Sequence, residues 1–384
     1  MISGTSYDGI DVACCEFTQR DEVIELVQHG FVSIPYSNEL HDAIADAMPP
    51  RTVDMERVCI LDTHIGQAFA AAALEAIKKF NFTPDLIVSH GQTLFHWIDA
   101  QYKAQGTLQL GEASWIAERT GSAVLSNIRA RDVASGGHGA PLVSLLDVLL
   151  FGDSPNKEGA LNLGGISNIT VAGRGFMPIA YDIGPANALL DIAIFAHSNG
   201  KLSFDEDGKI AASGKVDSAL LEKFLQEPYY ELTPPKSTGK ELFHLDYLIK
   251  MAGPVSSWNF PNLMATLLEL TVETVARDVE RFRLTKLYVA GGGSANPVMM
   301  KRMRERLNPC VVESMAVLGI DPRAKEGVTF ALIGFLSAHG QPGQVPSCTG
   351  ASGERILGSF TPGSGPLILP TPSSVPAKRI TVLK

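Results

Sequence analysis

The stretch that most constrains this fold is a pair of short β runs meeting at Gly164-Gly165, followed by a strand that carries Asp182. Apolar and small polar residues alternate from 161 to 170 around the glycine pair, which is the pattern of a β-hairpin. Glycine allows close backbone approach, and successive N–H groups in such a turn can bind an anion. A Gly-Pro break and an apolar-periodic helix follow Asp182, and Pro185 suits the first turn of that helix. The pattern therefore predicts a carboxylate beside a phosphate cradle and a helix N-terminus.

Each part of this stretch also has a purely structural interpretation. A Gly-Gly pair is common in hairpin turns, and an acid before a helix commonly caps it. The functional interpretation gains weight only when other segments of the chain are added.

Length and charge limit the class of protein. A chain of 384 residues exceeds what one core usually supports, so we expect two domains. We place the boundary in the polar segment at 152, which gives domains at 1–152 and 153–360 and a Pro/Ser-rich tail at 361–384. The net charge of −9 argues against nucleic-acid binding, which normally needs a basic face.

The five cysteines include no C-x-x-C pair, so neither a disulfide framework nor a zinc site is indicated. The N-terminus has no secretory leader pattern, and no apolar run approaches the ~18 residues of a membrane span. We therefore expect a cytoplasmic protein that has no membrane partner.

Periodicity along the chain predicts an α/β protein. Strands are expected at 9–17, 24–34, 85–93, 123–126 and 286–290, and helices at 39–79, 113–120, 142–151, 297–307 and 325–339. In such folds ligands bind at the carboxyl ends of parallel strands. His90 follows one of these strands as a candidate base, although a structural hydrogen-bonding role is favoured.

The chain lacks several common catalytic motifs. Lys236-Ser237-Thr238-Gly239-Lys240-Glu241 approaches a Walker A loop, but no Ser or Thr follows Gly239-Lys240 and Pro234 replaces the first glycine. No G-x-S-x-G, no strand-borne G-x-G-x-x-G and no protein-kinase triplet is present. Serine-hydrolase, P-loop and Rossmann functions are therefore disfavoured.

Eight segments, in order, resemble those of the anhydro-N-acetylmuramic acid kinase family of sugar kinases, and together they cover the chain up to about Gly363. They are Ser3–Asp11, Ser89–Thr93, Gly136–Pro141, Asn162–Asn168, Asp182–Asn187, Lys236–Glu241, Gly291–Asn296 and Ala324–Glu326.

The resemblance implies two ribonuclease-H-like domains of the actin, hexokinase and Hsp70 type around a nucleotide cleft. It implies ATP-dependent hydrolytic opening of 1,6-anhydro-N-acetylmuramic acid with phosphorylation at O6, a step of cell-wall sugar recycling. ATP and Mg²⁺ are the implied cofactors, the anhydrosugar is the small-molecule partner, and a homodimer is common in the family.

The resemblance also implies roles for individual residues. Asp182 is the expected base that activates water, and Asp182 and Glu326 are the expected Mg²⁺ ligands. Asp8, Thr93, Arg129 and Glu326 are expected to face the sugar. The expected nucleotide-binding residues are Gly4, Thr5, Ser6, Asp8, Gly9, Asp11, Gly164, Gly165, Asn168, Gly184, Asn187, Gly291, Gly292, Gly293 and Asn296.

The chain departs from the family pattern at four places. The strand that normally precedes Ser3 is reduced to Met1-Ile2, and Tyr7, Asn127 and His138 replace the usual residues at their positions. The first departure leaves open an inactive, degenerate kinase or a misassigned start. Levoglucosan kinase is the alternative within the class, and a non-catalytic actin-like nucleotide-binding protein is the alternative outside it.

Overall fold

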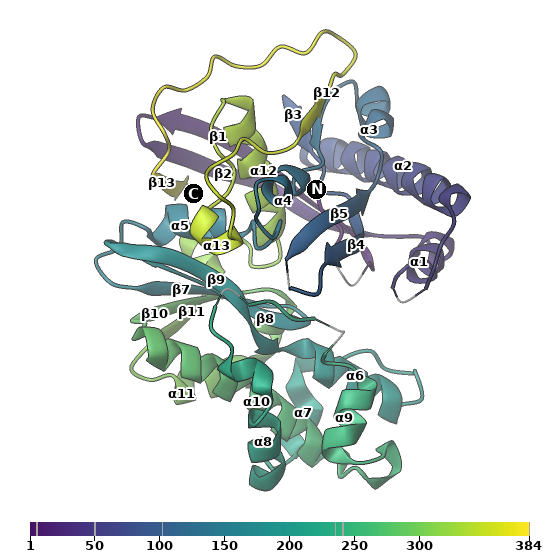
Figure 1. The fold of residues 1–384 in the computed structure, drawn as a ribbon, viewed down its shortest axis with the longest axis vertical. Helices are drawn as coiled ribbons and strands as arrows, with labels where there is room; N and C mark the ends of the chain where they lie inside the picture. Colours follow the sequence, from purple (N-terminus) through teal and green to yellow (C-terminus); the bar gives the residue numbers. More distant parts are fainter. Residues whose placement is uncertain (5–6, 50, 102, 235, 240–241, 384) are drawn as a thin grey trace. The chain divides into compact units, whose positions relative to one another are not determined.

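The computed structural model describes residues 1–4, 7–49, 51–101, 103–234, 236–239 and 242–383 (Figure 1). It divides into two compact units: unit 1 comprises residues 1–150 and 319–384, and unit 2 comprises residues 151–318. The predicted domain boundary at 152 lies two residues after residue 150, where the first part of unit 1 ends. Residues 319–360, which the sequence analysis assigned to the second domain, instead belong to unit 1, as does the tail.

Unit 2 is built on a five-stranded sheet with the order β11-β10-β7-β8-β9. The first three strands in sequence form an antiparallel meander, and β10 and β11 extend it in parallel with β7. This is the ribonuclease-H-like order, so the expected α/β class is confirmed. The strands are β7 (Glu158–Leu163), β8 (Ile166–Gly173), β9 (Phe176–Pro185), β10 (Lys286–Ala290) and β11 (Val311–Ser314).

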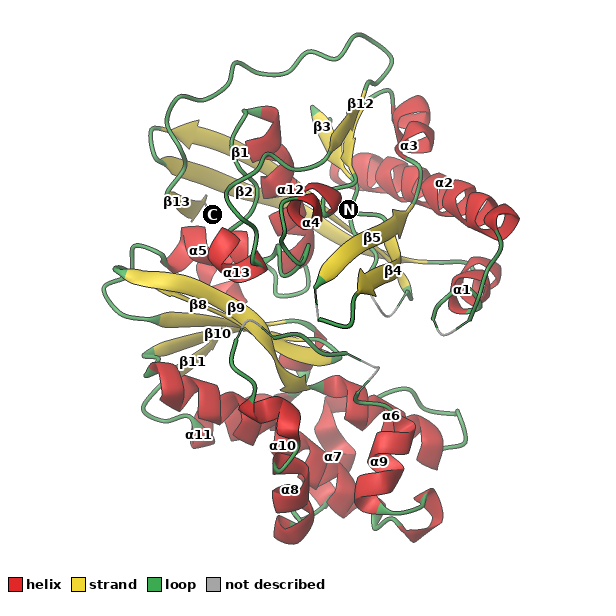
Figure 2. Cartoon of the chain, viewed as in Figure 1, coloured by secondary structure: helices red, strands yellow, loops and turns green. Residues whose placement is uncertain are grey.

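The helices of unit 2 gather on one face of this sheet (Figure 2). They bury a core that alternate strand residues such as Leu161, Ile169 and Tyr181 share with α10. The helices are α6 (Asn187–His197), α7 (Lys209–Ser213), α8 (Ser218–Leu225), α9 (Leu245–Ala252), α10 (Phe260–Phe282) and α11 (Pro297–Arg306).

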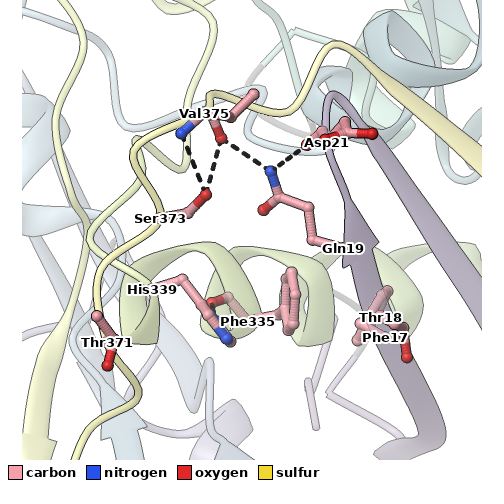
Figure 3. Close-up of a pocket in the computed structure, with 9 residues that line it drawn as sticks. All are labelled: Phe17, Thr18, Gln19, Asp21, Phe335, His339, Thr371, Ser373 and Val375. Carbon is pink, nitrogen blue, oxygen red and sulfur yellow. Dashed lines mark hydrogen bonds between the residues drawn. The ribbon is translucent and has the colours of Figure 1, made fainter.

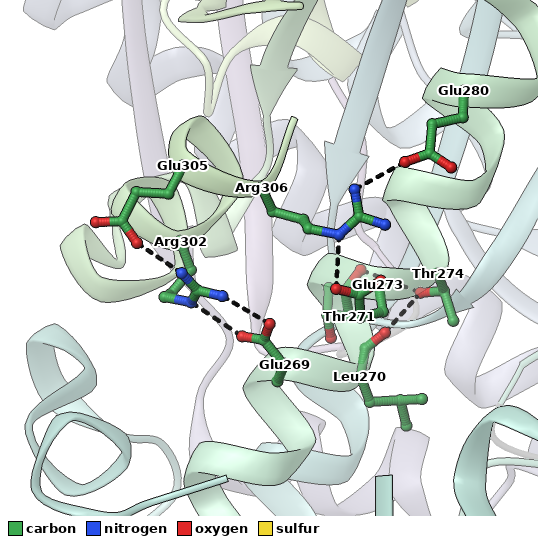
Figure 4. Close-up of polar contacts among 9 residues, drawn as sticks. All are labelled: Glu269, Leu270, Thr271, Glu273, Thr274, Glu280, Arg302, Glu305 and Arg306. Atoms are coloured by element: carbon green, nitrogen blue, oxygen red, sulfur yellow. Dashed lines mark hydrogen bonds and ion pairs between the residues drawn. The ribbon is translucent and has the colours of Figure 1, made fainter. Parts of the chain in front are cut away.

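Ion pairs join α10 to α11 (Figure 4). Arg302 donates to both carboxylate oxygens of Glu269, at 3.0 and 2.7 Å. One turn further along α11, Arg306 donates to Glu273 at 2.7 Å and to Glu280 at 2.8 Å. These bidentate and shared contacts hold α11 at a set position along α10.

Unit 1 contains two three-stranded sheets, ordered β1-β2-β13 and β12-β6-β3, and a β4-β5 hairpin. The strands are β1 (Gly9–Arg20), β2 (Val23–Pro35), β3 (Leu86–Val88), β4 (Gln92–Ile98), β5 (Ala104–Leu110), β6 (Ala123–Ser126), β12 (Ser359–Thr361) and β13 (Arg379–Leu383). The helices are α1 (Asn38–Ala45), α2 (Met55–Phe80), α3 (Ala113–Thr120), α4 (Ala130–Ala134), α5 (Ser144–Phe151), α12 (Lys325–Ala338) and α13 (Pro346–Thr349).

The C-terminal segment belongs to unit 1 because its strands pair there. β12 pairs with β6, and β13 pairs in parallel with β2. The sequence analysis predicted a Pro/Ser-rich tail at 361–384, and residues 379–383 at its end form β13. A short apolar alternation in a Pro/Ser-rich context is a weak strand signal, and only the partner strand β2 reveals it.

The first three residues bridge the edges of two strands. Ile2 pairs antiparallel with Asp11 of β1, and Ser3 pairs in parallel with Gln92 of β4. The N–H of His90 donates to the carbonyl of Met1 at 3.0 Å. Met1 to Ser3, where the sequence analysis expected a strand reduced to Met1-Ile2, thus connect β1 with β4 through two isolated bridges.

The predicted elements at 113–120, 123–126 and 286–290 coincide with α3, β6 and β10. Pro185 was predicted in the first turn of a helix, and this is wrong, because β9 continues to Pro185 and α6 begins at Asn187. The described helices include none with the length and apolar character that a membrane span requires.

Candidate active site

Asp182 lies in a polar row that crosses the sheet of unit 2. Asn168 of β8 pairs with Asn162 of β7 on one side and with Asp182 of β9 on the other. Their sequence neighbours Leu161, Ile169 and Tyr181 are core residues. Since strand side chains alternate between faces, the row points away from the helices of unit 2.

A β-bulge lies next to Asp182. Gly184 pairs with Ser167 and Asp182 pairs with Asn168, so Ile183 is the extra residue on β9. Bulges are frequent beside active sites, where they change the direction of a side chain. Here the bulge separates Asp182 from the glycine that follows it.

Hydrogen bonds with several described residues hold Asp182. Its N–H donates to the carbonyl of Lys236 at 3.2 Å, and its Oδ2 accepts the N–H of Thr238 at 3.1 Å. The hydroxyl of Tyr229 donates to the carbonyl of Asp182 at 2.6 Å. The acid is therefore hydrogen-bonded to residues that lie 47 to 56 positions away in the sequence.

The glycine turn is bonded to the start of α6. The N–H of Asn187 donates to the carbonyl of Gly164, and the N–H groups of Ala186 and Ala188 donate to the carbonyl of Gly165. The side chain of Asn187 also donates to the carbonyl of Gly164 at 2.8 Å. The N–H groups at the start of α6 therefore hold the glycine turn against this helix.

At three glycine positions of unit 2, neither the backbone conformation nor the packing requires a glycine. A Cβ atom at Gly164 or Gly165 would meet only ordinary contacts of 3.5 Å or more, and one at Gly292 would meet no described atom within 4 Å. None of the three has a positive φ. These positions leave the backbone accessible at the ends of β7 and β10, which are parallel neighbours.

Other predicted nucleotide residues have structural reasons for their identity. A Cβ at Gly184 would lie 2.8 Å from the Tyr230 ring, and one at Gly293 would lie 2.8 Å from Cβ of Leu163. Gly291 has φ +83°, where glycine is favoured.

Asn296 is the N-cap of α11: its Oδ1 accepts from the N–H groups of Val298 and Met299. Its side chain therefore has a structural role that the sequence analysis did not assign.

In unit 1, His90 and Arg129 form a defined pair. The Arg129 Nε donates to His90 Nε2 at 2.7 Å, and Arg129 also donates to the carbonyl of Gly139 at 2.6 Å. Since arginine can only donate, His90 Nε2 is an acceptor and His90 Nδ1 carries the proton that bonds to the carbonyl of Gly91 at 2.9 Å. Burial and the Arg129 charge hold the pKa of His90 well below its ordinary value. The structural role expected for His90 fits this arrangement.

Glu326 lies in the first turn of α12, one turn before Phe330. The Arg129 guanidinium lies 5.6 Å from the centre of the Phe330 ring. Burial raises the pKa of Glu326, as does the charge of Asp11, while Arg129 and Lys325 oppose the shift. The predicted sugar-side residues Arg129 and Glu326 are thus close enough to interact electrostatically.

A buried ion pair supports the start of α12. The Lys325 ammonium lies 2.8 Å from the carboxylate of Asp147 on α5, and both side chains are almost fully buried. This pair anchors the residue next to Glu326.

The first loop contributes several predicted residues. Ser3 Oγ donates to the carbonyl of Gly9, and the side chain of Gln92 donates to the carbonyl of Gly4 at 3.2 Å. A Cβ at Gly9 would lie 2.6 Å from a β2 carbonyl, so this glycine allows strand packing. Asp8 is exposed.

Two further predicted residues of unit 1 have partners on adjacent strands. Asp11 pairs with Ser33 in the β1-β2 register, and Thr93 Oγ1 accepts from the side chain of Gln109. The predicted phosphate residues Thr5 and Ser6 lie outside the described residues, as do Lys240 and Glu241.

The predicted site residues thus form two groups, each within one unit. Asp182, Asn168, Asn187, Asn296 and the glycines at 164–165, 184 and 291–293 lie in unit 2. Asp8, Asp11, Thr93, Arg129 and Glu326 lie in unit 1.

Two cavities of unit 1 contain none of the predicted site residues. One of about 460 Å³ lies beside Gln19, His339 and Ser373 (Figure 3). The other, of about 750 Å³, is lined by residues of β1, β3 and the C-terminal segment.

Sequence reasoning missed the contacts that hold Asp182. Tyr229 and the Lys236–Gly239 segment had no predicted connection with the acid, although the segment was noted as a failed Walker A motif. Hydrogen bonds across some fifty residues have no local sequence signal.

Comparison with known proteins identifies one family across the chain. The family model described as "Anhydro-N-acetylmuramic acid kinase" matches residues 1–363. A protein of that name from Streptomyces coelicolor is 46% identical, with 100% of this chain and 98% of the relative aligned. Another, from Rhodococcus erythropolis, is also 46% identical and aligns over 100% of this chain and 99% of its own length.

A more distant relative of the same name from Caldanaerobacter subterraneus is 37% identical over 94% of this chain and 96% of its own length. Among solved structures, the activator of the 2-hydroxyisocaproyl-CoA dehydratase from Clostridium difficile, with bound ADPNP, aligns with a TM-score of 0.39 and 9% identity. That alignment covers 85% of this chain and 94% of that one.

Proposed function

This chain belongs to the anhydro-N-acetylmuramic acid kinase family, and we propose that it uses ATP and water to convert 1,6-anhydro-N-acetylmuramic acid to N-acetylmuramic acid 6-phosphate. The proposal includes a cytoplasmic role in the recycling of cell-wall sugar. Its main structural support is the position of Asp182 in a polar row with Asn168 and Asn162, because Asn162 lies two residues before the accessible turn at Gly164.

In the proposed reaction, water attacks C1 of the anhydro ring while the C1–O6 bond breaks. The water proton passes to the carboxylate of Asp182, and O6 takes the γ-phosphoryl group as ADP departs. General-base assistance of this kind contributes about 10²–10⁴ in rate. Positioning and charge neutralisation supply most of the rest in phosphoryl transfer.

The two groups of residues would have different roles, one in binding phosphates and the other in binding the sugar. The bare backbone at Gly164, Gly165 and Gly292 in unit 2 gives room for phosphates to approach N–H groups, as ATP binding requires. Arg129 and Glu326 in unit 1 would contact the sugar. The guanidinium is held in one orientation by His90 and Gly139.

Asp182 and Glu326 are the proposed carboxylates for Mg²⁺, which prefers oxygen ligands. Glu326 suits a cation because burial and the neighbouring Asp11 both disfavour its negative charge, which a cation would neutralise. When bound, Mg²⁺ would neutralise charge on the phosphates.

The test is an assay of purified protein with ATP, Mg²⁺ and either 1,6-anhydro-N-acetylmuramic acid or levoglucosan, following ADP and the 6-phosphate. We expect turnover with the first sugar. Asp182→Asn should reduce kcat at least ~10²-fold, the low end of general-base catalysis, while calorimetry shows ATP binding little changed.

Asp246→Asn, at an exposed acid in the first turn of α9, is the matched control and should keep wild-type turnover. Near-wild-type turnover in Asp182→Asn would remove Asp182 from the mechanism. Turnover of levoglucosan alone would identify the other anhydrosugar as the substrate.

A further inference from the structure

The failed Walker A segment of unit 2 lies against Asp182 and surrounds it with main-chain contacts. The carbonyl of Lys236 accepts the Asp182 N–H, and two residues later the N–H of Thr238 donates to the Asp182 carboxylate. The described part of the segment, 236–239, therefore contacts the acid at both its backbone and its side chain.

The side chain of Lys236 holds this segment in place. Its ammonium donates to the carbonyl oxygens of Tyr229 and Tyr230, at 3.1 and 3.3 Å. It also lies 4.5 Å from the centre of the Tyr229 ring and 5.8 Å from that of Tyr181, within the range of a cation–π interaction. The half-buried ammonium is thus held by carbonyls and aromatic rings.

Tyr229 closes the network. Its carbonyl and ring contact Lys236, and its hydroxyl donates to the carbonyl of Asp182 at 2.6 Å. A displacement of Lys236 would therefore reach Asp182 directly through the Lys236 carbonyl, and also through the N–H of Thr238 and the hydroxyl of Tyr229.

We infer that Lys236 is a positioning residue for Asp182: by binding the Tyr229 and Tyr230 carbonyls, its ammonium holds the segment that orients the carboxylate. This inference rests on the proposed role of Asp182 as the base. A misplacement of ~1 Å in a catalytic group costs on the order of 10² in rate, so loss of the ammonium should be visible in kcat.

The test compares Lys236→Met, which keeps the length of the side chain but removes the ammonium, with the wild type and with Lys236→Arg. We expect Lys236→Met to lower kcat ~10²-fold while KM for both substrates changes less than about twofold. Lys236→Arg keeps a cation with hydrogen-bond donors at this position. Its kcat should be at least tenfold higher than that of Lys236→Met. ATP affinity and Tm serve as measures of folding.

Lys223 provides a matched control in unit 2. Its ammonium also donates to two backbone carbonyls, at 2.6 Å to Met251 and 3.4 Å to Lys250, but it belongs to α8. Lys223→Met should leave kcat within twofold of wild type, because the contacts described for Asp182 involve neither Lys223 nor the two carbonyls that it binds.

A double variant separates the positioning role of Lys236 from the proposed role of Asp182 as the base. If Lys236 acts through Asp182, then Lys236→Met should not lower the residual rate of Asp182→Asn further. An inactive Asp182→Asn with a fully active Lys236→Met would overturn the positioning role alone. A Lys236→Met protein that loses ATP binding and thermal stability in parallel would also overturn it, since the residue would then be only structural. An active Asp182→Asn would overturn the base assignment itself.

Discussion

At the scale of single residues, the candidate site holds its charged groups mainly through main-chain groups. Asp182 accepts the N–H of Thr238, and Arg129 donates to the carbonyl of Gly139. Such contacts help to fix the orientation of a charged side chain. At Glu326 the environment changes the cost of carrying a charge, because burial raises the pKa of this carboxyl.

We predict a pH-dependent stability difference for Glu326→Gln. A carboxyl whose folded pKa exceeds its unfolded value near 4.5 takes up protons on folding, so the folded state loses stability as pH rises from that value through the folded pKa. Glu326→Gln has no titratable carboxyl at this position, so its folded state does not lose this stability as the pH rises. It should therefore melt at a higher temperature than wild type at pH 8. At pH 4 the two should melt together.

Calorimetric or circular-dichroism melts at both pH values provide the measurement. Glu222→Gln, at an exposed position on α8, is the control and should show no pH-dependent difference. A Glu326→Gln protein less stable than wild type at pH 8 would mean that attraction to Arg129 and Lys325 outweighs burial.

At the scale of elements, the α10–α11 contact shows how ion pairs fix two helices. Glu269 is only 7% exposed, and Arg302 satisfies both of its oxygens. Charged side chains so far from water depend on their partners. The neighbouring pair Lys301–Glu305 is exposed and spans 3.9 Å.

Arg302→Met should destabilise the protein by roughly 1.5–3 kcal/mol, because it removes charge-assisted hydrogen bonds and leaves a buried carboxylate unsatisfied. Lys301→Met should cost no more than about 0.5 kcal/mol, as expected for an exposed ion pair. Denaturant unfolding of both variants measures the difference. Equal effects in the two would show that the contact between Arg302 and Glu269 adds no stability beyond a surface pair.

At the scale of the whole molecule, the chain leaves unit 1 at 151 and returns to it at 319. Unit 2 is therefore a continuous insertion with its own sheet and core. Unit 1 is discontinuous, and its strands β6 and β2 need β12 and β13 from the far end of the chain.

This division predicts that the fragment 151–318 folds alone. It should show one cooperative thermal transition by circular dichroism, because its core is complete within the fragment. A chain ending at 318 should show that same transition without the one that belongs to unit 1, since it lacks α12, β12 and β13. An unfolded fragment 151–318 would contradict the independence of unit 2.

Much of this protein follows from local patterns in its sequence. Hydrophobic periodicity and glycine punctuation predicted the Gly164-Gly165 hairpin, the strand with Asp182 and the ranges of α3, β6 and β10, because these signals lie within a few neighbouring residues. The eight segments predicted the family that the comparisons confirm. The site roles assigned by that resemblance remain predictions.

Only the tertiary structure decided which distant segments meet. It assigned residues 319–384 to unit 1, and it placed Lys236, Thr238 and Tyr229 around Asp182. In the structure β9 continues to Pro185, and the N–H groups at the start of α6 donate to the carbonyls of the glycine turn. These outcomes depend on hydrogen bonds and packing between residues far apart in the chain, whereas the patterns readable in one sequence report only neighbours.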